Sequence, residues 1–182
     1  MTLEIVDAEV GHLLAIQAIY AHWVIHGLAS FEESPPDVAE IDRRRQEVQE
    51  RGLPYLAARD GALIQGFAYA GPYRARSAYR YTVEDSVYVA PEARGRGVGR
   101  ALLGEVIRRC ELRSLRQMLA VIGDSANHAS VGLHEALGFR HAGHLRSVGF
   151  KHGHWVDSVL MQRALGQGDA SPPHPPAKHG RS

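Results

Sequence analysis

The segment from Val87 to Leu103 constrains the fold more than any other part of the chain. An apolar stretch of β type leads into a turn with glycines at positions 95, 97 and 99, and an amphipathic helix follows. Glycines lack Cβ atoms and let backbone N–H groups converge, while the first turn of a helix offers unpaired donors and a positive dipole end. Arg94, Arg96 and Arg100 add guanidinium groups that bind phosphate oxygens. The segment therefore predicts a strand, turn and helix that bind a polyanion such as a pyrophosphate.

Spacing argues against the two common nucleotide-binding loops. A dinucleotide fingerprint would have its third glycine at position 100, where the chain has Arg100, and no acidic residue ends a second strand about twenty residues later. A Walker A loop needs Gly-Lys-Ser/Thr, and Gly99-Arg100-Ala101 has neither the lysine nor the hydroxyl. The remaining alternative is a solvated loop without a ligand, which its position directly after a strand disfavours.

Length and composition favour one α/β domain in a reducing compartment. A chain of 182 residues can bury roughly two-thirds of the surface that its unfolded form exposes. Lysine and arginine (21) nearly balance aspartate and glutamate (20), which gives no support to nucleic-acid or membrane binding. A single cysteine, Cys110, excludes an intrachain disulfide, and there is neither a bilayer-spanning apolar run nor a signal-peptide pattern. We expect a soluble, cytoplasmic protein.

Strand and helix patterns alternate along the chain, and Asp60-Gly61 marks a hairpin turn. Strands are expected over residues 3–6, 54–59, 62–70, 79–89, 117–122, 139–149 and 155–163, and helices from Asp7 to about Gly27, 37–51, 97–112 and 127–137. From Gly166 onward the composition shifts to Gly, Pro, Ser and His. We therefore predict a folded domain over residues 1–165 and a disordered tail over 166–182, with no metal site among the histidines.

Two motifs carry a resemblance to a known superfamily. Arg94-x-x-Gly97-x-Gly99 resembles the acetyl-CoA motif of the GCN5-related N-acetyltransferases, and the segment Asn127 to Phe139 resembles their Asn-x-x-Ser/Ala-x-x-Leu-Tyr-x-x-x-Gly-Phe helix. The resemblance implies an acetyl-CoA-dependent N-acetyltransferase with a mixed α/β fold, in which a largely antiparallel sheet flanked by helices splays between its central strands. The CoA-binding residues that we expect are Val87, Tyr88, Val89, Arg94, Gly95, Arg96, Gly97, Val98, Gly99, Arg100, Asn127 and Ser130.

Further blocks narrow the resemblance to one subfamily. The segments 70–79, 82–84, 121–123, 134–138 and 149–153 look like the phosphinothricin and methionine sulfone/sulfoximine N-acetyltransferases, over about residues 3 to 163. That likeness implies a metal-free homodimer that acetylates small amino-acid analogues. It also implies that Phe31, Tyr73, Arg74 and Arg76 shape the substrate pocket. Guanidinium groups suit anionic substrates because they bind a carboxylate or phosphinate bidentately. The alternative for the two arginines is a solvated basic loop.

The chemistry requires a base for the amine, a donor to the carbonyl oxygen and an acid for the thiolate. Glu84, within an otherwise apolar and aromatic strand, is the expected base, and backbone N–H groups around residues 87–89 are the expected donors. His134 stands where many members have a tyrosine that acts as general acid, and it is the expected acid here. Alternatives stay open for both residues: Glu84 pointing to solvent, and a structural role for His134. Two other functions also stay open, namely an acetyltransferase for another small amine or a protein N-terminus, and a non-catalytic CoA-binding module.

Overall fold

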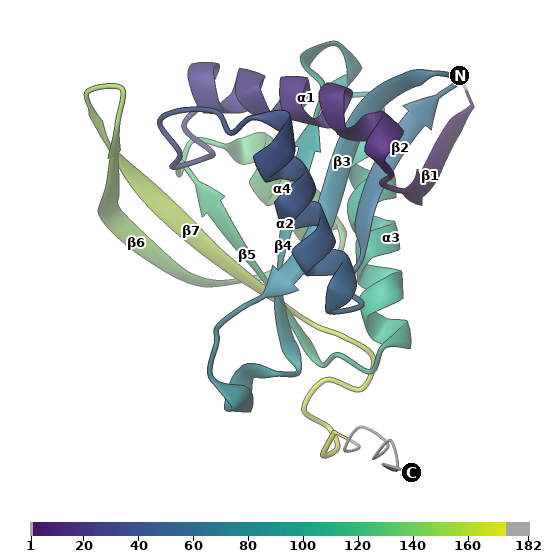
Figure 1. Ribbon diagram of the computed structural model, residues 1–182. Coiled ribbons are helices and arrows are strands. Elements are labelled where there is room, and N and C mark those ends of the chain that lie inside the picture. The colour runs from purple at the N-terminus through teal and green to yellow at the C-terminus, as the bar shows by residue number, and fades with distance from the viewer. Residues whose placement is uncertain (1, 174–182) are drawn as a thin grey trace.

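The computed structural model describes residues 2–173, which form one seven-stranded sheet with helices on both faces (Figure 1). The strands lie in the order β1-β2-β3-β4-β5-β7-β6, and every neighbouring pair is antiparallel except β4 and β5. The strands are β1 (Leu3–Asp7), β2 (Tyr55–Asp60), β3 (Leu63–Pro72), β4 (Thr82–Val89), β5 (Gln117–Gly123), β6 (Arg140–Lys151) and β7 (His154–Ala164), and the helices are α1 (Leu13–His26), α2 (Val38–Glu50), α3 (Val98–Leu112) and α4 (His128–Ala136). The predicted fold class is confirmed.

The expected elements all form, and their boundaries differ where short 3₁₀ turns intervene. The first helix begins at Leu13 because residues 10–12 form such a turn, and the strand expected from residue 79 begins at Thr82 for the same reason. Asp37 caps α2 as predicted, because its side chain accepts a hydrogen bond from the N–H of Glu40 at 2.8 Å. Local patterns therefore predict the elements well and their ends within a few residues.

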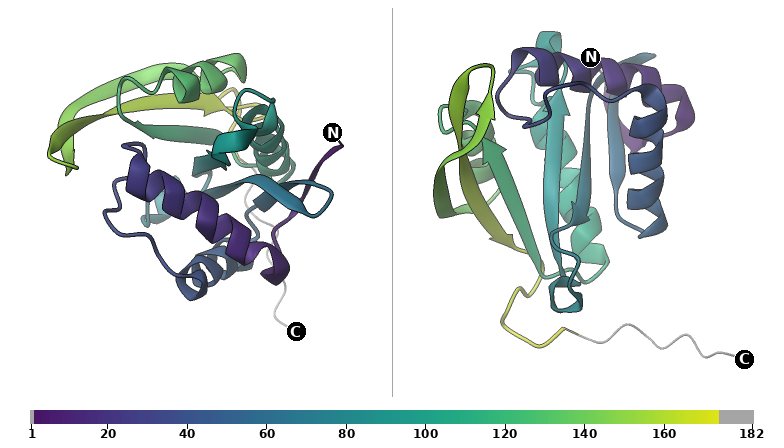
Figure 2. Two further views of the ribbon diagram at one scale, coloured as in Figure 1. Left: turned by 90° about the horizontal axis from the view of Figure 1, so that it is seen from above. Right: turned by 60° about the vertical axis from the view of Figure 1, so that its left-hand side comes forward.

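The sheet opens between its two central strands. β4 and β5 are paired only from Thr82 to Asp85 and from Gln117 to Ala120. Beyond these residues β4 stays with β3 while β5 stays with β7, so the two strands diverge (Figures 1 and 2). The splay implied by the resemblance is confirmed, and it leaves one edge of β4 without a strand partner.

Two helices cover each face of the sheet. Figure 2 shows α1 and α2 on one side of the sheet and α3 and α4 on the other. One side of α3 is entirely buried against the sheet, and its buried residues are Val98, Leu102, Leu103, Val106, Ile107 and Cys110. Each fully buried aliphatic side chain of this size contributes about 1.5–3 kcal/mol. The helix that follows the glycine turn is thereby fixed firmly to β2, β3 and β4.

The chain after β7 continues along the lower end of the sheet. Leu165 is fully buried, and Arg116 donates hydrogen bonds to the carbonyl oxygens of Gly168 and Pro172. Residues 174–182 of the expected tail lie outside the described residues, so the predicted domain and tail boundary stays a prediction. Within residues 2–173, no helix is long and apolar enough to cross a membrane, and no three His, Cys, Asp or Glu side chains gather as metal ligands would.

Two glycines test how closely α3 packs on the sheet. A Cβ at Gly104 would meet nothing within 4 Å, whereas a Cβ at Gly66 would lie 2.7 Å from the carbonyl oxygen of Tyr88. Because glycine is unfavourable in a helix interior, we expect Gly104→Ala to raise the free energy of unfolding by about 0.5–1 kcal/mol. Gly66→Ala should lower it. Urea denaturation measures both, and a loss of stability in Gly104→Ala would contradict this description of α3.

Candidate active site

A cleft of about 890 Å³ occupies the opening between β4 and β5. It passes from one face of the sheet to the other, since Tyr20 and Trp23 of α1 line it together with Leu133 and His134 of α4. Residues 84–89 of β4, residues 120–123 of β5 and the loop after α1 complete the wall. A cavity of this size suits a small-molecule ligand.

The glycine turn presents an open helix N-terminus to this cleft. Gly95 and Gly97 have φ angles of 72° and 81°, in the left-handed region that favours glycine. Asn127 and Asp37 cap α4 and α2 with their side chains, whereas no side chain caps α3. The first N–H groups of α3 are therefore available to an anionic ligand.

Gly99 lies where α4 approaches α3 closely. A Cβ at Gly99 would lie 3.2 Å from Cδ2 of Leu133, tighter than an ordinary contact. Leu133 and the turn both line the cleft, so the start of α3 and one side of α4 form a narrow cradle. The glycine spacing that predicts phosphate binding also allows this packing.

Two of the three predicted arginines line the cleft. The Arg94 guanidinium lies over the Trp23 ring at 5.6 Å from its centroid, and Trp23 Nε1 donates a 2.8 Å hydrogen bond to the carbonyl oxygen of Val89. Arg100 lines the cleft from the first turn of α3. Arg96 is absent from the lining, although its neighbours on both sides are part of it.

The free edge of β4 runs along the cleft. Val87, Tyr88 and Val89 all line it, beyond the last residue that pairs with β5. Tyr88 is held from the other side, since its ring packs edge-on against Tyr20 and stacks on Phe67 with centroids 4.9 and 5.1 Å apart. This strand therefore presents a rigid backbone edge to a ligand.

Glu84 lines the same cleft near the point where the strands part. Its side chain is half-buried, and burial raises the pKa of its carboxyl above the usual value. The negative charge of Asp85 raises this pKa further, while the Arg74 guanidinium acts against both. The predicted base is thus a partly desolvated carboxyl, as a general base requires.

His134 is buried between α4 and β4 and has partners on both ring nitrogens. Its Nδ1 lies 2.7 Å from the carbonyl oxygen of Ser130, and its Nε2 lies 3.0 Å from Oδ2 of Asp85. Burial alone would lower the pKa of His134, but the hydrogen bond and charge of Asp85 outweigh it and raise the pKa. The ring also lines the cleft, so the geometry is compatible with both the acidic and the structural alternatives.

The start of α4 contributes the other two expected CoA-binding side chains. Asn127 Oδ1 accepts a hydrogen bond from the N–H of Ser130 at 3.2 Å, which caps the helix. Both residues line the cleft. Their positions therefore agree with the expected contact to a ligand, and their binding role stays a prediction.

The loop between α1 and α2 closes the α1 side of the cleft. Phe31 lines the cleft, and a Cβ at Gly149 of β6 would lie 2.5 Å from its ring. Lys151 Nζ donates a 2.6 Å hydrogen bond to the carbonyl oxygen of Ser30, and Arg44 forms a 2.6 Å ion pair with Glu32. The β6–β7 hairpin and α2 thus hold this loop from two sides.

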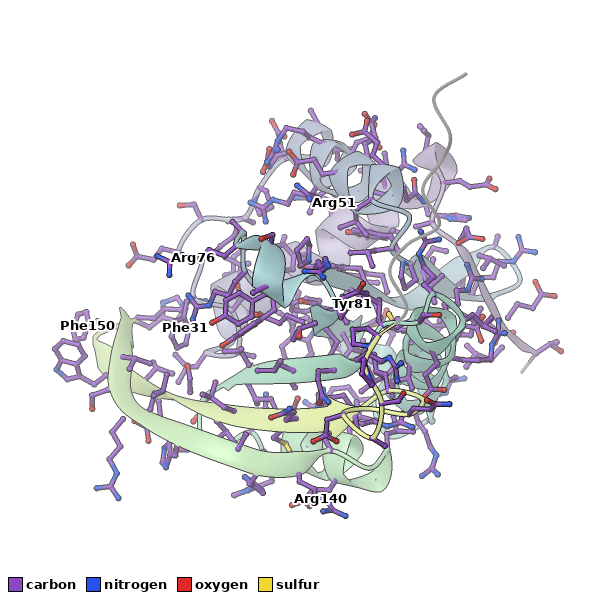
Figure 3. The ribbon with its side chains drawn as sticks, turned by 90° about the horizontal axis from the view of Figure 1, so that it is seen from below. Phe31, Arg51, Arg76, Tyr81, Arg140 and Phe150 are labelled. Carbon is purple, nitrogen blue, oxygen red and sulfur yellow. The ribbon has the colours of Figure 1, made fainter. Side chains whose placement is uncertain are left out.

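The segment between β3 and β4 does not reach the cleft lining. The chain between β3 and β4 lies at the lower end of the sheet (Figure 1) and contains Tyr73, Arg74 and Arg76. Arg74 Cζ stacks 5.1 Å from the centroid of the Tyr73 ring. Seen from below, Arg76 projects on the same side of the molecule as Phe31 (Figure 3). The structure brings Phe31 into the cleft but not these three residues, and their assignment as pocket residues stays a prediction.

The sequence analysis missed several cleft residues, among them Tyr20, Trp23, Glu32 and Asp85. The sequence did contain an indication for Asp85. It shares one face of β4 with Val83 and Val87, and an acidic side chain on an apolar strand face indicates that a polar partner is buried beside it. The other three come from α1 and its following loop, where no local pattern indicates contact with β4.

Comparisons with known proteins agree with this site. Residues 16–139 match the acetyltransferase (GNAT) family. The chain is 60% identical to the phosphinothricin N-acetyltransferase of Alcaligenes faecalis, over 88% of this chain and 82% of that one. It is 40% identical to the L-methionine sulfoximine/L-methionine sulfone acetyltransferase of Pseudomonas aeruginosa, over 91% and 96%.

A solved structure matches nearly the whole chain. The GNAT superfamily phosphinothricin acetyltransferase from Sinorhizobium meliloti, in complex with AcCoA, superposes with a TM-score of 0.93 and 44% identity, covering 98% of this chain and 97% of that chain. The likeness therefore extends from the sequence motifs to the complete fold.

The charge balance around Glu84 can be measured directly. Arg74 lowers the pKa of Glu84, so Arg74→Ala should raise that pKa, and the carboxyl should ionise at higher pH than in the wild type. Carbon NMR titration of the Glu84 carboxyl measures the change. Arg76→Ala, in the same segment, is the matched control and should leave the titration unchanged. Equal titrations in Arg74→Ala and wild type would contradict the assigned electrostatics.

Proposed function

The chain belongs to the acetyltransferase (GNAT) family and is an N-acetyltransferase, and we propose that it acetylates the α-amino group of small amino-acid analogues from acetyl-CoA. Phosphinothricin, methionine sulfone and methionine sulfoximine are the proposed substrates, in line with the names of its relatives. The observation that carries the proposal is the meeting of Glu84 and the uncapped N-terminus of α3 in one cleft. One side can hold a polyanionic cosubstrate while the other receives an amine.

Acetyl-CoA, when bound, supplies an activated acetyl thioester. The fit of this cosubstrate is supported by the cleft that Gly99 and Leu133 both line and by the free donors of α3. Arg94 and Arg100 would hold the phosphates, and Asn127 and Ser130 at the start of α4 would bind the pantetheine arm. The glycine turn would thus orient the thioester toward the opening in the sheet.

Glu84 would accept the proton of the substrate ammonium group, directly or through one water. Burial raises the pKa of Glu84, which makes its carboxylate a stronger base. N–H groups on the free edge of β4 over residues 87–89 would donate to the acetyl carbonyl oxygen, where negative charge develops. His134 would supply a proton on the α4 side of the cleft.

An aromatic wall of the cleft and two arginines of the segment between β3 and β4, outside the cleft lining, suit these analogues. Phe31 offers an aromatic wall to the substrate side chain. Arg74 acts electrostatically on Glu84 from the segment below, and either Arg74 or Arg76 would pair with the carboxylate or the oxidised head group of the substrate. An anionic substrate is thereby favoured over a simple amine.

An exposed apolar surface supports the proposed homodimer. Phe150 and Trp155 pack edge-on on the β6–β7 hairpin, yet they are 57% and 68% exposed, and Leu145 and Val148 of β6 are also exposed. Figure 3 shows Phe150 projecting from the outer edge of the molecule. Apolar patches of this kind mark interfaces, and we propose that a second copy covers this one. Sedimentation velocity tests the pairing.

The buried, unpaired Cys110 is consistent with the proposed cytoplasmic location.

The experiment that tests the function is an assay of thiol release with a panel of amines. The panel contains the three analogues, unmodified amino acids and a peptide with a free N-terminus. We expect the analogues to be the best substrates and Glu84→Gln to lose a factor on the order of 10² to 10⁴ in rate while still binding acetyl-CoA. A protein that binds acetyl-CoA without any turnover would instead be a non-catalytic binding module, and a Glu84→Gln variant with wild-type turnover would remove Glu84 as the base.

The glycine turn provides a separate test of cosubstrate binding. Gly97→Val places a β-branched residue at a φ of 81°, which strains the turn at the point where α3 begins. We expect its Kd for acetyl-CoA to rise at least about tenfold, equivalent to about 1.4 kcal/mol, while circular dichroism stays unchanged. Gly104→Ala, in the same helix but away from the turn, is the control. Unchanged affinity in a folded Gly97→Val protein would separate the turn from acetyl-CoA binding.

A further inference from the structure

Asp85 is a buried acid to which the proposed reaction gives no role. Its side chain is 2% exposed and that of His134 is 3% exposed, with Nε2 and Oδ2 3.0 Å apart. The other carboxylate oxygen, Oδ1, is buried and has no hydrogen-bond partner among the described residues. A buried charge with a single partner is costly, so this contact must satisfy a specific chemical need.

The hydrogen-bond geometry fixes the number of protons in the pair. The carbonyl oxygen of Ser130 can only accept, so Nδ1 of His134 carries a hydrogen. If neither Nε2 nor Oδ2 carried one, two lone pairs would face each other at 3.0 Å. One proton therefore occupies this contact, and its removal would leave the Asp85 carboxylate buried without any donor.

Few other ionisable groups surround the pair. Glu84 on the same strand and Cys110 of α3 both interact electrostatically with Asp85. Burial raises the pKa of the Cys110 thiol to about 12, so it stays neutral. β5 has no ionisable side chain from Met118 to Gly123, and on α4 the neighbouring Glu135 is exposed and paired with His141. Asp85 is therefore the charge that governs His134.

The two chemical roles in the cleft make opposite demands on pH. Glu84 must be ionised while His134 is protonated. Burial raises the pKa of Glu84, which shortens the pH interval in which both conditions hold. The contact with Asp85 raises the pKa of His134 and widens that interval.

We propose that Asp85 is a positioning residue that keeps His134 protonated on the α4 side of the cleft while Glu84 is ionised. The inference rests on the proposed acetyl transfer. As the carbon–sulfur bond breaks, its electron pair goes to sulfur, and the proton shared by Nε2 of His134 and Oδ2 of Asp85 leaves their contact to form the S–H bond. The lone pairs of Nε2 and Oδ2 then face each other, which favours uptake of a proton from solvent and restores the pair.

Asp85→Asn tests the charge without removing the contact. An asparagine has the same shape, and its amide N–H can donate to Nε2 of a neutral ring. We expect the basic limb of the kcat/KM profile to move down by about one pH unit or more, with the midpoint of His134 protonation in nitrogen NMR falling with it. The acidic limb should move down slightly, because Asp85 also raises the pKa of Glu84. Asp85→Ala removes the contact as well and should lower the rate at every pH.

Glu135→Gln is the matched control, because it removes the carboxylate partner of His141 at 3.2 Å, one residue along the same helix. It should leave both the rate profile and the His134 signal unchanged. If Asp85→Asn kept the basic limb of the wild type, the proposal would be overturned, because a contact without the carboxylate charge would then be enough to keep His134 protonated. If that variant does not fold, the wild type decides, because a His134 midpoint at or below the ordinary value would overturn the proposal. The NMR titration measures the protonation of His134 even if no amine is acetylated, so this inference can fail or succeed separately from the proposed function.

Discussion

The short parallel pairing of β4 with β5 is the constraint on which the rest of this structure depends. Four residues of each strand pair, and after Asp85 and Ala120 the strands part. Because β3 and β7 continue to pair with their outer edges, the inner edges of β4 and β5 can face a ligand while the rest of the sheet stays paired. The cleft, the free backbone edge and the access from both faces all follow from this one interruption.

The opening also explains why two adjacent carboxyls of β4 have such different surroundings. Successive side chains of a strand point to opposite faces, so Glu84 meets the α1 side and Asp85 meets α3 and α4. Glu84 stays half-buried in the cleft, whereas Asp85 is buried beside His134. The alternation of a single strand thus separates a group that can accept a proton from a pair that holds one.

Polar contacts hold the walls of the cleft in place from elements that are distant in the sequence. Tyr20 donates a 3.1 Å hydrogen bond to Glu32, and Lys151 reaches the carbonyl oxygen of Ser30 from the far end of β6. Burial lowers the pKa of Lys151, while the charges of Glu32 and Glu33 favour its ammonium form. Such contacts fix a loop that has no regular structure of its own, and they join the substrate side of the cleft to the hairpin where a second copy is proposed.

The sequence by itself determined the features that depend on neighbouring residues. Hydrophobic periodicity, the helix start at Asp37, the Asp60-Gly61 turn and the glycines at positions 95, 97 and 99 act over a few residues, so they predicted the elements and the glycine turn before α3. The resemblance supplied the strand splay, while Glu84 was indicated by its place in an otherwise apolar and aromatic strand. Tertiary structure alone decided that Arg94 and Arg100 line the cleft while Arg96 does not, and that Asp85 meets His134, 49 residues away. These contacts join separate elements, and no local pattern records the packing that brings them together.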